Sequence, residues 1–147
     1  MKTQRSFIDL AKDRSRGLDA LKGTSIPAVY SDAVRLDLNG CTMLFISGKI
    51  GVKENGTLAG RTIGEQTRQT LENIKAVLTR EGGIMDDIVR VRVYVTQCDS
   101  ASIRDVHEAR SGYWTPGKYP ASTLVRVDQL IRDGALIEID ADAVIVR

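Results

Sequence analysis

The chain has 147 residues with a formal net charge of +2 at pH 7, and 42% of its residues are hydrophobic. This length suits one compact domain and is enough to bury a core without disulfides or a structural metal. The near balance of charges argues against a dedicated nucleic-acid binder, and no apolar run approaches the ~20 residues that a membrane span requires. We therefore expect neither a nucleic-acid partner nor a membrane partner.

The N-terminus and the cysteines indicate the compartment. The first residues include Lys2 and Arg5 and lack the apolar core of a secretory signal, so we expect a cytoplasmic protein. In that compartment Cys41 and Cys98 stay reduced. Together with the single histidine, His107, they cannot complete a structural zinc site unless carboxylates or a second chain contribute. The sequence predicts no metal.

Residues 1–23 differ in pattern from the rest of the chain. Their apolar residues recur near helical spacing, and Ser6 with Asp9 resembles a helix N-cap pair. We predict a short amphipathic helix that ends near Gly23. This N-terminal extension would pack on its own subunit or on a neighbour, ahead of a domain formed by residues 24–147.

The next segment shows the alternation of β-strands. Residues 34–38 alternate between apolar and polar side chains, and an apolar run follows over residues 42–47. Asn39-Gly40 separates them and predicts a tight hairpin, because this dipeptide suits the positive φ angles of the turn. Asn55-Gly56 predicts a second reversal of the chain.

Residues 62–80 give the clearest helix. Thr62 and Glu65 form a capping-box pattern, an apolar stripe follows at helical spacing, and Gly82-Gly83 supplies a common form of helix exit. The sequence therefore predicts a helix with defined ends.

The remaining elements alternate between strands and a helix. Residues 89–95 predict a strand with two unlike faces, because valines alternate there with Arg and Tyr. Residues 100–113 predict a second helix, and residues 122–127 and 136–146 predict the last two strands. The order β-β-α-β-α-β-β predicts a two-layer α+β sandwich with both helices on one face of a mixed sheet. A valine-rich open face would then be sealed by a homo-oligomer.

Six stretches of the chain resemble the Rid/YjgF enamine–imine deaminase family. They are residues 30–34, 45–50, 65–75, 87–95, 119–123 and 137–141. Their order and spacing extend the resemblance over roughly 120 positions, the size of a complete domain.

The resemblance implies a chorismate-mutase-like α+β fold and a homotrimer. It also implies that a small-molecule substrate binds in three clefts between subunits and that the reaction needs no cofactor. Deaminases of the family hydrolyse reactive enamines and imines to a 2-keto acid and ammonia.

The resemblance also assigns site residues. Glu138 matches the glutamate that positions or activates the hydrolytic water, and Tyr30 matches a tyrosine near the mouth of the cleft, so we predict both as catalytic. Ser47 and Gly48 match a Ser-Gly pair that passes close to the ligand, and we predict that they bind substrate. An ion pair with an arginine at the subunit interface is an open alternative for Glu138.

Ser122 departs from the family pattern. Deaminating members carry at this position an arginine that grips the substrate carboxylate, whereas serine offers one hydroxyl and no charge. Arg104, Arg126 and His107 are candidates to complete the substrate site, although an isolated arginine is by default a solvated one.

Two functions remain open from the sequence. The first is a cofactor-free hydrolytic deaminase acting on an enamine, an imine or a related labile nitrogen compound, with a substrate other than the usual 2-iminopropanoate. The second is a non-catalytic ligand-binding or regulatory trimer, which the missing arginine at Ser122 favours. Ribonuclease activity ranks last, because the sequence has neither a pair of histidines nor a dense basic patch.

Overall fold

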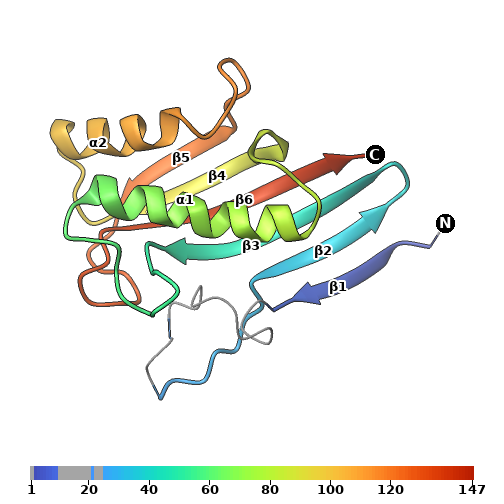
Figure 1. Cartoon of the computed structure of the whole chain (residues 1–147), viewed down its shortest axis with the longest axis horizontal. Coiled ribbons are helices and arrows are strands. Elements are labelled where there is room, and N and C mark those ends of the chain that lie inside the picture. The colour runs from blue at the N-terminus through green and yellow to red at the C-terminus, as the bar shows by residue number, and fades with distance from the viewer. Residues whose placement is uncertain (1, 10–20, 22–24) are drawn as a thin grey trace.

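The computed structural model describes residues 2–9, 21 and 25–147 (Figure 1). These residues form a six-stranded sheet in the order β1-β2-β3-β6-β4-β5, with helices α1 and α2 packed on one of its faces. In chain order the elements are β1 (Gln4–Ile8), β2 (Ala33–Leu38), β3 (Cys41–Ile50), α1 (Ile63–Arg80), the 3-10 helix η2 (Met85–Asp87), β4 (Ile88–Val95), α2 (Ser100–Ser111), β5 (Ala121–Arg126) and β6 (Ile137–Val146). Strands β4 and β5 run parallel and their neighbours antiparallel, so the predicted two-layer α+β fold with a mixed sheet is confirmed.

The N-terminal segment departs from its prediction. Gln4–Ile8 form the edge strand β1 and pair antiparallel with β2, so the predicted helix is wrong for these residues. A short segment with weak periodicity has little helical stability of its own, and the hydrogen-bonding edge of β2 offers its backbone better partners. The rest of the predicted helix, residues 10–20 and 22–23, lies outside the described residues.

Both predicted reversals are present. Leu38 pairs with Cys41 across Asn39-Gly40, which makes β2 and β3 a hairpin. Val52 bridges Leu58 around the second Asn-Gly turn. The chain between β3 and α1 is therefore folded back on itself rather than extended.

The predicted capping motifs define α1. The Thr62 hydroxyl accepts a hydrogen bond from the Glu65 N–H, and the Glu65 carboxylate accepts one from the Thr62 N–H. At the other end Gly82 adopts a φ of 83°, and the N–H of the next residue donates to the Leu78 carbonyl at 2.8 Å. The left-handed exit is confirmed, and it turns the chain toward η2 and β4.

The core lies between the helices and the sheet. In β4, Val91, Val93 and Val95 face the helices and are buried, together with Ile137 and Ile139 of β6. The expectation of a valine-rich open face is therefore wrong for this part of the sheet, because the pleat places these valines inside. The open face instead pairs polar residues across the two strands: Arg90, Arg92 and Tyr94 with Asp142, Asp140 and Glu138.

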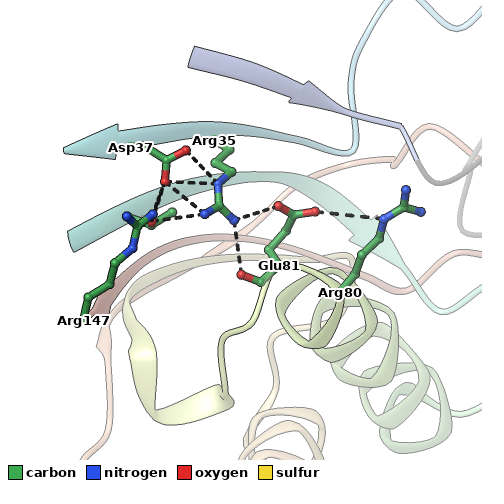
Figure 2. A network of polar contacts seen from close by, with 6 residues as sticks. Arg35, Asp37, Arg80, Glu81 and Arg147 are labelled. Atoms are coloured by element: carbon green, nitrogen blue, oxygen red, sulfur yellow. Dashed lines mark hydrogen bonds and ion pairs between the residues drawn. The ribbon is translucent and has the colours of Figure 1, made fainter. Parts of the chain in front are cut away.

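A polar network joins β2, the end of α1 and the C-terminus (Figure 2). The Arg35 guanidinium donates to the Asp37 carboxylate at 2.9 Å and to the Glu81 carboxylate at 3.0 Å. Arg147 also contacts Asp37, and Arg80 lies beside Glu81 at the edge of the network. Hydrogen bonds from Arg35 lower the pKa of Asp37 to about 2, so this carboxylate stays charged in ordinary buffers.

Candidate functional site

A β-bulge in β3 shapes the open face of the sheet. Ile46 and Lys49 keep regular partners on β6, while Ser47 and Gly48 together stand opposite Asp140. Bulges bend a strand and redirect its side chains, and they are frequent beside active sites. Here the bulge brings the backbone of β3 into contact with a side chain near the start of β6.

That side chain is Glu138, and its position requires a glycine at residue 48. A Cβ atom built on Gly48 would lie 2.1 Å from Oε1 of Glu138 and 3.0 Å from its carboxyl carbon. These separations are far below van der Waals contact, so the glutamate packs directly on the backbone of the bulge. Glu138 and the Gly48 backbone, which were predicted separately as site residues, are therefore in direct contact.

A cavity of about 630 Å³ surrounds this contact on the open face of the sheet. Its described lining comprises Tyr30, Val34, Phe45, Ile46, Ser47, Gly48, Arg92, Ile131, Glu138, Asp140 and Asp142. Four of the residues predicted from the sequence therefore line one cavity: Tyr30, Ser47, Gly48 and Glu138. Apolar side chains on one side and carboxylates on the other give the cavity two chemically different walls.

Burial tunes the carboxyl group of Glu138. Partial removal from water raises its pKa above the usual range for glutamate, and the negative charge of Asp140 raises it further. Both effects disfavour the ionised form, because it loses hydration and meets a like charge. A carboxylate with a raised pKa is a stronger base, so Glu138 is suited to accept a proton from water.

The segment that carries Tyr30 is tied to the bulge. The Ser47 hydroxyl donates to the Ser31 carbonyl at 2.6 Å, and the Ser47 N–H donates to the Asp32 carbonyl at 2.9 Å. Lys49, which is 1% exposed, pairs with the Asp32 carboxylate. Lys49 and Asp32 thus anchor on β3 the segment that directly follows Tyr30.

Three charged residues of the cavity were not predicted as site residues. The Arg92 guanidinium donates to Asp140 at 2.7 Å and to Asp142 at 3.0 Å. These bonds raise the pKa of Arg92, which remains fully charged. The sequence did contain a signal for the two aspartates, because they alternate with apolar residues along the same strand as Glu138. That spacing places three carboxylates on one face of β6.

The other predicted substrate-binding residues lie elsewhere. Ser122 pairs with Val91 and therefore faces the helices, whereas Glu138 pairs with Tyr94 on the open face. Ser122 and His107 line a second cavity of about 380 Å³, between α2 and β5. Within one chain the predicted site is thus split between opposite faces of the sheet.

Arg104 and Arg126 line neither cavity in the described part of the chain. Arg104 is on the exposed side of α2. Arg126 is at the far end of β5, where its Nε donates to the Thr96 carbonyl at 3.3 Å. The default interpretation of solvated arginines fits both positions better than the predicted role in substrate binding.

The groups around Glu138 are suited to proton transfer and to hydrogen bonding of a small polar molecule. The cavity offers one basic carboxylate, a phenol, a hydroxyl and backbone groups of the bulge. Among the described residues, no group of three or more His, Cys, Asp or Glu side chains is placed to hold a metal ion. Over the same residues, no helix is long and apolar enough to cross a membrane.

Comparisons with known proteins agree with the fold. A family profile described as endoribonuclease L-PSP matches residues 24–145. A RutC family protein of Pyrococcus abyssi is 35% identical over 115 residues, which cover 78% of this chain and 84% of the relative. The 2-iminobutanoate/2-iminopropanoate deaminase of Salmonella typhimurium is 31% identical over 109 residues, covering 72% and 80%. A crystal structure of a Rid family protein from Yersinia pestis is 30% identical and covers 95% of this chain and 98% of its own, with a TM-score of 0.72.

Proposed function

The chain belongs to the Rid/YjgF family, and from this premise we propose that it is a cofactor-free hydrolytic deaminase acting on an enamine, an imine or a related labile nitrogen compound. The observation that carries the proposal is the half-buried Glu138 carboxylate, which packs on the bulge at Gly48 in the wall of a cavity. A relative of 31% identity is a 2-iminobutanoate/2-iminopropanoate deaminase. With serine at residue 122, the substrate of this chain need not be 2-iminopropanoate.

The proposed reaction uses Glu138 as a general base. Its carboxylate accepts a proton from a water molecule while the water oxygen bonds to the carbon of the C=N group. The protonated Glu138 gives this proton to the nitrogen, which leaves a neutral carbinolamine. Glu138 then takes the proton of the new hydroxyl group and passes it to the amino nitrogen, so that the C–N bond breaks, a carbonyl forms, ammonia leaves and the Glu138 carboxylate is regenerated. Tyr30 and backbone N–H groups of the bulge stabilise the developing charge. Enamines and imines also hydrolyse without a catalyst, so a modest set of groups suffices.

We further propose that the reactive site lies between two subunits of a homotrimer. Glu138 and Ser122 point to opposite faces of the sheet, so a single chain does not present both to one small molecule. A second chain that docks its β5 edge on the open face would bring its Ser122 close to Glu138 of the first chain. Phe45 supports this docking, because it is 41% exposed on that face.

The residues of this cavity also bear on two alternative functions. A ligand-binding trimer without turnover would use the cavity but not the basicity of Glu138. Ribonuclease activity fits less well, because Glu138, Asp140 and Asp142 outnumber the one guanidinium of Arg92 in the described lining. Such a surface repels the phosphates of RNA rather than attracting them.

The test is a trapping assay in which a dehydratase generates 2-aminoacrylate and its decay is followed with added protein. We expect wild type to accelerate the decay, and Glu138→Gln to lose at least about 100-fold in rate, in the range of lost general-base catalysis. Glu108→Gln makes the same chemical change at an exposed position of α2 and should match wild type. Equal rates for Glu138→Gln and wild type would overturn the proposal. A folded wild-type protein that leaves the decay of this and of longer 2-enamines unchanged would favour the ligand-binding alternative.

A further inference from the structure

The cavity between α2 and β5 has the composition of an anion site. Its volume is about 380 Å³, and Arg110, Trp114, His107 and Ser122 contribute to its lining. No carboxylate is among the described residues that line it. It therefore differs from the cavity at Glu138, which is rich in carboxylates.

Arg110 supplies the guanidinium group in the lining of this cavity. It lies on the inward face of α2 and is 8% exposed, which is unusual for an arginine. Its Nη2 donates to the Ser122 hydroxyl at 3.2 Å, while Nη1 is buried and has no hydrogen-bond partner among the described residues. A buried guanidinium is ordinarily satisfied by a carboxylate or a phosphate, so this one lacks its acceptor.

A second unsatisfied donor lies beside it. Nε1 of Trp114 is buried and likewise has no partner within the described part of the chain. The Trp114 ring lies 5.8 Å from the guanidinium carbon of Arg110, which holds the two side chains together. Buried donors without acceptors are rare in folded proteins. Two of them at one cavity indicate that an acceptor binds there from outside the chain.

We propose that Arg110, with the Ser122 hydroxyl and the Trp114 indole N–H, binds the carboxylate of the substrate. Arg110 reaches from α2 to the hydroxyl of Ser122 and so supplies the guanidinium that residue 122 lacks. The ligand class is a small monocarboxylate. One guanidinium and neutral donors match a single negative charge, whereas a phosphate dianion calls for further cations. This assignment rests on the proposed function for its claim that the carboxylate belongs to the substrate, which is then a 2-enamino or 2-imino acid.

The sequence offers a direct probe of binding, because Trp114 is its sole tryptophan. Butanoate and butanamide are stable and nearly isosteric, and they differ in charge. At constant ionic strength set with sodium chloride, we expect butanoate to change the Trp114 fluorescence of the full-length protein saturably. Butanamide should bind at least about tenfold more weakly, because it lacks the charge that a guanidinium recognises.

Variants identify the residue responsible. Arg110→Gln should weaken butanoate binding at least about tenfold, and Arg110→Lys should give an intermediate loss, since an ammonium keeps the charge but not the planar fork. Lys53→Gln removes one positive charge from an exposed turn and should bind like wild type within about twofold. Thermal melts establish that each variant is folded. If Arg110→Gln does not fold, two other measurements still test whether Arg110 binds a carboxylate. They are the comparison of butanoate with butanamide and the binding of butanoate to Arg110→Lys.

Several results would overturn the assignment. They are the absence of any saturable change with butanoate, equal binding of butanoate and butanamide, and unchanged binding in a folded Arg110→Gln. If butanoate gives no saturable change and the Arg110→Gln oligomer also dissociates, a carboxylate of a partner subunit, not a ligand, is the acceptor of Arg110. Butanoate does not react, so its binding is independent of turnover. Saturable binding without imine hydrolysis would refute the proposed function alone, and hydrolysis without butanoate binding would refute this inference alone.

Discussion

At the scale of single residues, the carboxylate of Glu138 depends on the absence of a side chain at residue 48. The bulge brings the Gly48 backbone into the space that a Cβ atom would take, and Glu138 fills it. Burial at this contact also raises the pKa of Glu138 and so increases its basicity. Burial is thus the larger cause of the raised pKa, and the negative charge of Asp140 adds to it.

Gly48→Ala should abolish most activity while the protein stays folded. Its Cβ would displace the Glu138 carboxylate from the cavity wall, and misplacement of a catalytic group by ~1 Å can lower the rate about 100-fold. Gly112→Ala is the matched control, because Gly112 has an ordinary φ of −85° and open space around its Cβ direction. The trapping assay and a thermal melt measure the two effects. Wild-type turnover in Gly48→Ala would show that the contact has no catalytic importance.

Glu138→Gln should stabilise the protein at neutral pH. The folded state raises the pKa of Glu138 above its ordinary value of 4.5, so the carboxyl group favours folding when protonated and opposes it when ionised. The penalty is absent below about pH 4.5 and develops as the pH rises through the folded pKa. We expect a Tm increase of ~2–4 °C at pH 7 that disappears near pH 4. An equal or lower Tm for the variant at pH 7 would show that ionised Glu138 does not oppose folding.

The site was predictable from the sequence only in part. Tyr30, Ser47, Gly48 and Glu138 were identified through a resemblance, and all line one cavity. Arg110, for which we propose a binding role, was not predicted, because its hydrogen bond to Ser122 crosses from a helix to a strand. Local spacing does not show such a contact, and its signal, a pair of buried donors without acceptors, exists only in three dimensions.

At the scale of elements, the network around Arg35 holds the end of α1 against the sheet. Arg35 extends from β2 to the carboxylate and the main-chain oxygen of Glu81, at 3.0 and 3.2 Å, just past the end of the helix. Its remaining donors bind Asp37 and Thr42 within the same hairpin. The guanidinium is thus fully used between a strand and a helix terminus (Figure 2).

Arg35→Ala should lower the Tm by about 3–6 °C without loss of the fold, because several charged groups lose their shared partner. Arg80→Ala removes an arginine from the edge of the network, where its Nε lies 4.0 Å from Glu81. This control should change the Tm by no more than about 1 °C, as is usual for an exposed ion pair. Thermal melts at moderate ionic strength compare the two variants. Equal Tm values for Arg35→Ala and wild type would show that the network is not structural.

Elements with strong local signals were predictable, and the edge strand was not. Caps, the exit at Gly82 and the Asn39-Gly40 hairpin are encoded within a few residues, and each forms where the sequence indicated. Strand β1 is specified by its partner β2 rather than by its own pattern. Long-range pairing of this kind overrides a weak helical periodicity.

At the scale of the whole molecule, the sheet separates two chemically different sites. The carboxylate-rich cavity lies on the open face, and the cavity at Arg110 lies between α2 and the edge strand β5. A reaction that needs a base and a carboxylate-binding cation must join them. We propose that neighbouring subunits of a trimer do so, one supplying Glu138 and the other Arg110.

Subunit complementation tests whether the two residues act across a subunit boundary. Glu138→Gln and Arg110→Gln are each expected to be inactive in the trapping assay, and the two would be co-expressed in equal amounts so that they share trimers. If the site is shared, about one quarter of the clefts combine an intact Glu138 with an intact Arg110, so mixed trimers should recover about one quarter of wild-type activity. If both residues serve the same cleft from one chain, every cleft keeps a defect. Mixed trimers as inactive as their parents would contradict the claim.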